Sequence, residues 1–283
     1  MKKLFYTAIM TIFFVGCTST NKFNSLNLNG LKGNVKSVST ACYMAAERFG
    51  EIQKESLIES SDEWIPLFAK MIFEFNEYGN MQKETYLNSR GEVYRLIRHE
   101  NQGINIIATY VYDYDGELAY SWKTIFEDGK PKNIERFSRY EDTNNETIEC
   151  DFEGLCAVSE RHYKDGVITK TNESVYQNNL LCSFTSTDKD GNVTYQLNQE
   201  YTKDGQLAYR RHVSGGEDCL IENTTFNEKG LPVKYSRSGK WSNGNVDCTF
   251  EYSAFDKKGN WLSRIIKIED KPVCIQERTI EYY

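Results

Sequence analysis

A short motif recurs along this chain and constrains its fold more than any other feature. It consists of an aromatic residue, Asp or Asn, two further residues and Gly, and residues 112–116 (Tyr-Asp-Tyr-Asp-Gly) show it most clearly. Further copies occupy residues 75–79, 226–230 and 255–259, and looser copies end at other glycines. The clear copies supply eight predicted turn residues: Asn76, Gly79, Asp113, Gly116, Asn227, Gly230, Asp256 and Gly259.

Each residue type in this motif has a role in a tight turn. An Asp or Asn side chain accepts a hydrogen bond from the backbone two residues on, and Gly adopts a positive φ without steric cost. Together they predict a hairpin loop made of a type I turn and a left-handed residue. The flanking segments 71–75 and 106–112 are rich in β-branched and aromatic residues, which is typical of strands.

The spacing of the turns predicts an all-β fold. From Gly79 through Gly91, Gly103 and Gly116 to Gly129, successive glycines are 12, 12, 13 and 13 residues apart. A turn signal at this interval leaves strands of about eight residues. The chain holds about 20 such units, whereas open sheets rarely exceed about ten strands. We therefore expect a long antiparallel meander of repeated β-hairpins, curled into a barrel-like shell or folded over as a sheet.

The copy at residues 255–261, Phe-Asp-Lys-Lys-Gly-Asn-Trp, resembles the core of the YD-repeat (RHS-repeat-like) family. That core is an aromatic residue, Asp, two residues, Gly, and then Asn or Arg. The likeness covers roughly residues 70 to 265. It implies a β-repeat fold and, among short chains, a small lipoprotein of Gram-negative bacteria with no assigned activity.

Residues 1–16 have the form of a signal peptide. Lys2 and Lys3 precede an apolar stretch over residues 4–15, which is too short to span a bilayer as a helix. Residues 14–17, Phe-Val-Gly-Cys, resemble a lipobox, where bacteria attach diacylglycerol to the Cys. We expect removal of residues 1–16 and a lipid on Cys17, and the Thr that follows favours the outer membrane. The alternative is an ordinary signal peptide with an incidental Cys.

The rest of the chain divides into a tether and one domain. Residues 17–30 are rich in Ser, Thr, Asn and Lys, which is typical of a flexible tether. Residues 31–283 hold no Pro- or Ser-rich linker and are predicted to form a single β-repeat domain. A first strand is predicted over residues 35–40. Residues 45–63 fit either an irregular hairpin or a short helix.

The charge balance argues against nucleic acid as a partner. The chain has 34 basic and 41 acidic residues, a formal charge of −7. Loss of Lys2 and Lys3 with the signal peptide leaves 32 basic residues and a charge of −9. Binding to nucleic acid or to anionic lipid headgroups depends on a basic surface, which this composition does not supply.

The cysteines do not form a recognisable site. Besides the predicted anchor, the chain has Cys42, Cys150, Cys156, Cys182, Cys219, Cys248 and Cys274. An export compartment permits disulfides, and an odd number leaves at least one thiol free or bonded between chains. Cys150 and Cys156 flank a predicted turn and could face each other across a hairpin. No Cys-x-x-Cys occurs, which argues against zinc ribbons and thioredoxin-like chemistry.

The catalytic motifs of well-known enzyme classes are missing from the sequence. There is no Gly-x-Ser-x-Gly elbow, no phosphate-binding loop, no His-Glu-x-x-His and no dinucleotide fingerprint. Paired carboxylates fall on turns, where Asp has a structural role. Three histidines fall at similar phases of separate repeats and are not expected to meet at a metal: His99, His162 and His212. We expect no catalytic residue, no metal and no cofactor.

These observations predict a lipid-anchored protein of the cell envelope that is not an enzyme. We expect a scaffold or binding module for an envelope protein or a glycan, held at the membrane through Cys17. The 19 Tyr and 15 Phe are expected to pack the sheet, and a stacking surface for sugars or peptides is the alternative. Two other functions stay open: a hydrolase acting on glycan or peptide, and a carrier of an apolar ligand.

Overall fold

The computed structural model describes residues 23–59, 68–102, 105–127, 130–140, 146–153, 157–178, 180–242 and 244–283. Within these residues the all-β expectation is confirmed: the chain forms one 19-stranded sheet and one short helix, α1 (Ser25–Leu28). The signal peptide and Cys17 lie outside the described residues.

The strands follow one another along the chain as a meander. Their bounds are β1 (Val35–Arg48), β2 (Glu51–Leu57), β3 (Lys70–Phe75), β4 (Met81–Leu87), β5 (Val93–Gln102), β6 (Asn105–Tyr112), β7 (Leu118–Glu127), β8 (Lys130–Ser138), β9 (Glu146–Glu153), β10 (Ala157–Lys164), β11 (Val167–Gln177), β12 (Leu180–Asp188), β13 (Val193–Tyr201), β14 (Leu207–Ser214), β15 (Glu217–Phe226), β16 (Pro232–Ser238), β17 (Val246–Phe255), β18 (Trp261–Ile268) and β19 (Lys271–Tyr282). From β3 onward each strand pairs antiparallel with the next.

Strand β1 connects the two ends of this meander. It pairs with β19 from Val35 to Met44, and it also pairs with β3 from Ser37 to Ala41. The junction with the least pairing is β8 with β9, where one residue pair is aligned. The long-range pairing of β1 therefore fixes the first and last strands side by side.

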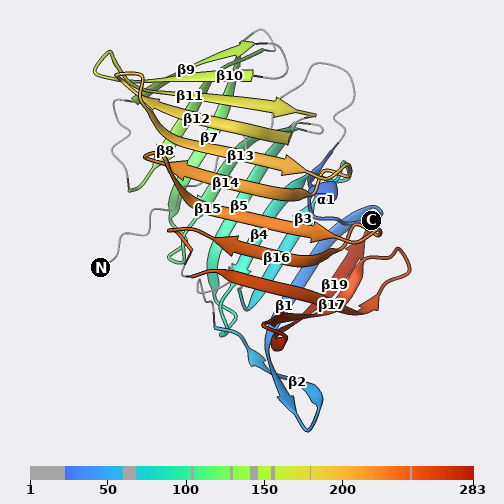
Figure 1. Cartoon of the computed structure of the whole chain (residues 1–283). Coiled ribbons are helices and arrows are strands. Elements are labelled where there is room, and N and C mark those ends of the chain that lie inside the picture. The colour runs from blue at the N-terminus through green and yellow to red at the C-terminus, as the bar shows by residue number, and fades with distance from the viewer. Residues whose placement is uncertain are drawn as a thin grey trace.

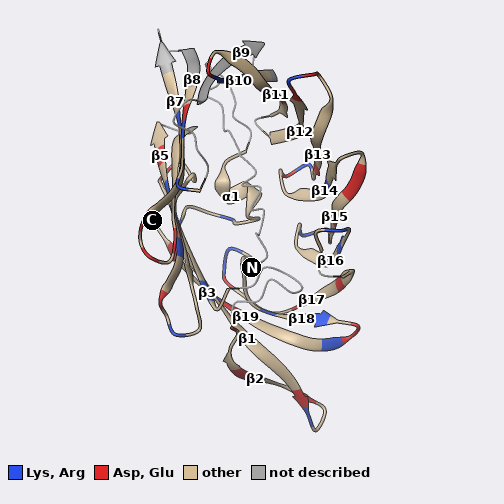
Figure 2. Ribbon diagram, turned by 90° about the vertical axis from the view of Figure 1, so that its left-hand side faces the viewer, with Lys and Arg blue, Asp and Glu red and all other residues tan. Residues whose placement is uncertain are grey.

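The sheet folds into two facing walls (Figures 1 and 2). Strands β3–β7 form one wall and β11–β16 the other, while β17–β19 with β1 join them at one end and β8–β10 at the other. Of the two arrangements expected, this is the folded sheet. The β1–β2 hairpin extends beyond the walls (Figure 1), with Ala45 opposite Lys54 and Arg48 opposite Glu51. A hairpin therefore occupies residues 45–57, and residues 60–67 lie outside the described part.

The recurrent motif forms one kind of turn, in which the Gly has a positive φ. In each copy the Gly N–H donates to the carbonyl of the first turn residue, and the N–H of that residue donates to the carbonyl four residues on, at 2.8–3.1 Å. These bonds are those of a type I turn followed by a left-handed residue. Within the described residues, copies of this turn begin at Asn76, Asn88, Asp113, Asp188, Thr202, Asn227 and Asp256.

The first side chain of the turn adds two further bonds in most copies. Asn227 Oδ1 accepts from the N–H groups of Lys229 (3.0 Å) and Leu231 (3.1 Å), for example. Asp113 forms the turn through its backbone, but among the described residues its carboxylate accepts from the Tyr140 hydroxyl and not from the turn's own N–H groups. There the neighbouring Asp115 accepts the N–H of residue 117 at 3.0 Å.

A second kind of turn is shorter and joins other hairpins. Two successive residues have a positive φ at Phe49–Gly50, Asp165–Gly166, Gly215–Gly216 and Glu269–Asp270. Two left-handed residues define the type I′ hairpin, whose twist matches that of the flanking strands. Some of the described hairpins therefore use a turn chemistry that the motif does not describe.

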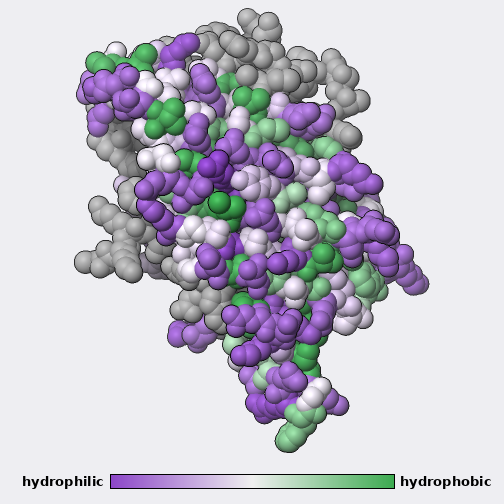
Figure 3. Space-filling view, viewed as in Figure 1, coloured by the Kyte–Doolittle hydropathy of each residue, from purple (hydrophilic) through white to green (hydrophobic). Residues whose placement is uncertain are grey.

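The faces that the walls turn toward each other carry both apolar and polar side chains. Three apolar clusters occur, around Leu197, around Phe75 and around Ile266. Buried polar residues accompany them: Glu160, His162, Asn172, Ser174, Ser186, Gln199, His212 and Gln276. On the side of the molecule shown in Figure 3, hydrophilic residues predominate and apolar residues are scattered among them.

The N-terminal segment of residues 23–32, including α1, docks against one edge of both walls (Figure 2). Leu26 N–H donates to Gly79 O at 3.1 Å in the β3–β4 turn. The ring of Phe23 lies beside Gly205 in the β13–β14 turn. Lys32 exchanges two hydrogen bonds with the Asn260 side chain in the β17–β18 turn, at 2.8 and 2.9 Å.

This docking corrects the expectation of a flexible tether over residues 17–30. Residues 25–28 are helical, and Asn24 caps the helix through a capping box. Leu26 and Leu31 pack with Val38 and Phe75 in one apolar cluster. Burial of two Leu side chains in a site that only the folded sheet provides overrides the polar composition of this segment. Residues 17–22 lie outside the described part.

Candidate functional site

Two adjoining hollows lie on the wall formed by β3–β6. The rim hollow has a volume of about 350 Å³ and is lined by Asn76, Glu77, Tyr78, Gln82, His99 and Asn101. The wall hollow has a volume of about 580 Å³ and is lined by Glu74, Gln82, Lys83, Arg98, His99, Glu100, Tyr110 and Tyr112. Gln82 and His99 line both, so the two form one continuous candidate site.

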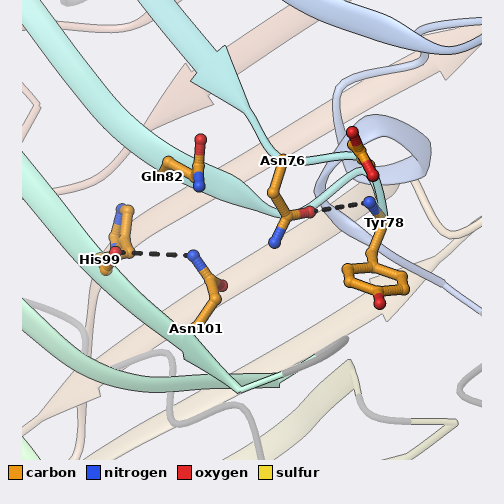
Figure 4. A pocket seen from close by; sticks show the side chains of 6 residues that line it. Asn76, Tyr78, Gln82, His99 and Asn101 are labelled. Atoms are coloured by element: carbon orange, nitrogen blue, oxygen red, sulfur yellow. Dashed lines mark hydrogen bonds between the residues drawn. The ribbon is translucent and has the colours of Figure 1, made fainter.

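The rim hollow is built mainly from amide side chains (Figure 4). Asn76, Gln82 and Asn101 lie around one space, and Tyr78 lies at its edge. Asn76 is held by the turn, since its Oδ1 accepts from the N–H of Tyr78 at 3.0 Å. Asn101 is held by its Nδ2, which donates to Met81 O at 3.1 Å. An amide offers both donors and acceptors, which suits a ligand rich in hydroxyl groups.

The wall hollow adds aromatic rings and balanced charges. Glu74, Lys83, Arg98 and Tyr110 are successive neighbours across four strands. Lys83 pairs with Glu74 at 2.8 Å, and Arg98 Cζ lies 5.7 Å from the Tyr112 ring centroid. Each charge therefore has a partner close by, and the tyrosine rings supply flat contact area.

His99 is fixed by hydrogen bonds on both ring nitrogens. Its Nε2 lies 3.0 Å from Glu84 Oε1 and its Nδ1 lies 2.9 Å from Thr109 Oγ1. Tyr86 also donates to Glu84, at 2.5 Å. Burial favours a higher pKa for Glu84, but the bonds from His99 and Tyr86 outweigh it and lower the pKa of this carboxyl. The network holds the imidazole rigidly where the two hollows meet.

The order carboxylate, imidazole, hydroxyl is also the order found in nucleophilic hydrolases. Here the hydroxyl belongs to Thr109, which is only 5% exposed. A nucleophile needs an open approach to a substrate carbonyl. The Glu84–His99–Thr109 arrangement therefore explains how the wall is held together better than it explains a reaction.

The other two histidines lie on β10 and β14, and each has its own hydrogen-bonding partners. His162 lies 2.8 Å from Asn172 Nδ2 and 3.5 Å from Glu160 Oε2. His212 Nδ1 lies 2.7 Å from the Tyr195 hydroxyl, and burial lowers the pKa of His212 to about 4. Within the described residues, no group of three or more His, Cys, Asp or Glu side chains is placed to hold a metal ion.

The cysteines whose side chains are described are free thiols. Cys42, Cys248 and Cys274 lie in one buried cluster with Ile266, while Cys182 and Cys219 lie elsewhere in the sheet. Cys150 is aligned with Glu160 across β9 and β10, and Cys156 lies outside the described residues. In the described part of the chain, no helix is both long and apolar enough to cross a bilayer.

The predicted turn residues occupy different edges of the sheet. Asn76 lines the rim hollow and Gly79 contacts the docked N-terminal segment. Gly259 lies near Lys32 of the same segment, and Gly230 lies beside Gln206, whose side chain also meets Gly30 of that segment. The turn of Asp113 and Gly116 has no such neighbour in the described part of the chain, where nothing lies within 4 Å of a Cβ built on Gly116.

The sequence interpretation missed the residues that make the hollows. Gln82, His99, Asn101 and Tyr112 come from three strands, and only their register brings them together. The available signal was a run of consecutive polar residues in β4 (82–85) and in β5 (98–102). That signal does not identify a site without the strand pairing.

Comparison with known proteins leaves the family open. No protein-family profile and no curated protein matches the sequence. A porin-like protein from Bacteroides uniformis is similar at 11% identity and a TM-score of 0.36, over 87% of this chain and 98% of that one. One from Bacteroides vulgatus is similar at 10% identity and a TM-score of 0.27, over 89% and 99%.

A Tc holotoxin pore from Photorhabdus luminescens is also similar, at 11% identity and a TM-score of 0.16. The likeness covers 71% of this chain and 15% of the toxin chain. Scores this low carry no conclusion about function. The candidate site must therefore be interpreted from its own chemistry.

Proposed function

We propose that this chain is a non-enzymatic, membrane-tethered protein of the bacterial cell envelope that binds a glycan in the joined hollows of β3–β6. The observation that carries the proposal is the lining of these hollows, which combines three amides, a fixed imidazole, the exposed Tyr78 ring and two half-buried tyrosine rings. An envelope protein is the competing partner.

The chemistry of the hollows favours a sugar over an apolar ligand. The amide of Gln82 and the Nδ2 group of Asn76 supply hydrogen-bonding groups for sugar hydroxyls. Tyrosine rings supply flat apolar contact without losing a polar edge. A carrier of an apolar ligand would instead need an enclosed apolar pocket.

The proposed tether sets the orientation of the domain. Cys17 precedes the docked Phe23 by six residues, a reach of about 20 Å at most. A lipid on Cys17 would hold the edge with the β3–β4 and β13–β14 turns toward the membrane. The rim hollow opens at that same edge, and the β1–β2 hairpin projects from the opposite one.

The proposal is tested by binding of the full lipidated chain, purified in detergent, to arrayed envelope glycans. We expect saturable binding that falls about tenfold with Gln82→Ala and with Tyr112→Ala, about 1.4 kcal/mol each. Gln53→Ala, an exposed glutamine on β2, is the matched control and should bind as wild type. No binding, or equal binding by all variants, rejects the glycan site.

The tether is tested separately by labelling cells with a clickable fatty acid. Wild type should take up the label and sediment with the outer membrane, and Cys17→Ala should do neither. Label on the Cys17→Ala chain, or none on wild type, would remove the anchor from the proposal.

A further inference from the structure

Two arginine side chains lie against one indole ring on β18 and β19. The Cζ atom of Arg278 is 3.6 Å from the ring centroid of Trp261, and that of Arg264 is 4.4 Å from the same centroid. The two positive charges are therefore no further apart than the sum of these distances, about 8 Å. This pair lies on the junction between the walls, away from the β3–β6 hollows.

Every hydrogen-bond partner of the two guanidinium groups is neutral. Arg278 Nε donates to Thr40 Oγ1 at 3.3 Å. Arg264 Nε donates to Gln276 Oε1 at 2.7 Å, and its Nη1 lies 3.5 Å from the Tyr252 hydroxyl. Among the described residues, no carboxylate bonds to either arginine. A guanidinium has five N–H donors, so most donors of this pair are unused by the protein.

Some other arginines of the sheet are paired with acids. Arg211 bonds to Asp218 at 2.7 Å on an exposed surface, and Arg210 lies 3.4 Å from Glu222 on the neighbouring strand. A pair of like charges without a counterion is costly inside a protein. Desolvation of the partly buried Arg278 side chain and the positive charge of the nearby Arg264 lower the pKa of Arg278 well below its usual range.

The unused donors face space that solvent can reach. Among the described residues, Arg237 Nε is a buried nitrogen without a hydrogen-bond partner. No nitrogen of Arg264 or Arg278 is both buried and unpaired in this way. Their free terminal nitrogens therefore retain accessible surface. Gln276 and Thr40 beside them are 2% and 4% exposed, so the base of this site is fixed by packed residues.

We propose that Arg264 and Arg278 together bind a small oxyanion, either a carboxylate or a phosphate group. The guanidinium fork matches both groups through two parallel N–H···O bonds. Trp261 contacts the guanidinium groups by cation–π interaction. The N–H groups that do not bond to Thr40, Gln276 or Tyr252 are left for the anion. The bound anion would supply the negative charge that the surrounding side chains lack. This site goes beyond the proposed glycan site and does not depend on it.

The experiment titrates the purified full chain with sodium phosphate and, separately, sodium acetate, at ionic strength matched with sodium chloride. Calorimetry measures the Kd and thermal unfolding measures the Tm. Wild type should show saturable binding and a rise in Tm with at least one of the two anions, and the preferred anion identifies the class. Arg264→Gln and Arg278→Gln should each weaken binding at least tenfold, whereas Arg211→Gln should bind as wild type.

Arg264→Lys provides a second variant should either Gln variant fail to fold. It keeps the charge but loses the fork, and we expect weaker binding than wild type with an unchanged Tm in chloride. The proposal is overturned if wild type binds neither anion more tightly than chloride. It is equally overturned if the Arg264 and Arg278 variants bind as tightly as Arg211→Gln.

Discussion

The docking of the N-terminal segment can be measured with two matched glycine substitutions. Gly79 and Gly116 occupy the same position in two copies of the turn, with φ of 78° and 79°. A Cβ on Gly79 would lie 2.4 Å from Asn24 Nδ2 and 2.9 Å from Leu26 Cδ1, whereas one on Gly116 would meet nothing within 4 Å. Ala at either position would therefore have the same backbone strain, but only Ala at position 79 would collide with the N-terminal segment.

The expected magnitudes follow from these contacts. Ala in the left-handed region costs about 1–2 kcal/mol, so Gly116→Ala should lower the free energy of unfolding by that amount. Gly79→Ala must also displace Asn24, whose loss as a cap costs about 1 kcal/mol. Withdrawing the buried Leu26 side chain adds about 1.5–3 kcal/mol. Together these contributions mean that Gly79→Ala should cost about 3.5–6 kcal/mol.

Urea unfolding followed by circular dichroism gives both free energies. Hydrogen exchange adds a local measurement, because Leu26 N–H is bonded to Gly79 O at 3.1 Å. Exchange at Leu26 should accelerate in Gly79→Ala and stay unchanged in Gly116→Ala. Equal destabilisation by the two substitutions, with Leu26 protected in both, would refute the docking.

Three further predictions concern the turns, a buried histidine and the thiols. Asn227→Ala leaves two N–H groups without their acceptor and should lower the free energy of unfolding in urea by about 1–2 kcal/mol. Asp113→Ala should lower it by less, because the Asp113 carboxylate accepts neither equivalent bond. His212 has a pKa lowered by burial from 6.5 to about 4, so the unfolded chain binds more protons between these pH values. Stability should therefore fall by up to about 3 kcal/mol as pH drops through that window, and His212→Gln should flatten the profile; an unchanged profile contradicts this. Cys248 is 1% exposed, and burial raises the pKa of its thiol to about 11. Iodoacetamide added to the native protein should therefore label the part-buried Cys182 before Cys248, as measured by mass spectrometry. Early labelling of Cys248 would contradict the packing.

The sequence predicted the parts of the fold that local chemistry determines. The motif beginning at Asn227 needs only its own five residues to form its turn, so the turns and the all-β meander were accessible without a structure. The copy at Asp113 shows the limit, because Tyr140, 27 residues on, takes the place of the local side-chain bonds. Local rules hold until a distant residue offers a competing partner.

The candidate sites and the N-terminal helix depend on pairing between distant segments. Arg278 bonds to Thr40, which is 238 residues away in the sequence. Leu26 bonds to Gly79 in the β3–β4 turn. Nothing in the local composition of residues 23–30 distinguishes a docked helix from a tether. The register of β1 with β19, which places Thr40 beside Arg278, arises only from closing the two ends of the meander.

The central claim, binding through the β3–β6 wall at the membrane, is tested most directly by photo-crosslinking in intact cells. A photo-reactive amino acid would replace Tyr112 in the wall hollow or, as the control, Tyr209 on β14 of the opposite wall. The account predicts a glycan-bearing adduct from position 112 and none from position 209. It also predicts loss of that adduct when Cys17→Ala is added. Equal adducts at both positions, or an adduct from position 209 alone, would contradict the account.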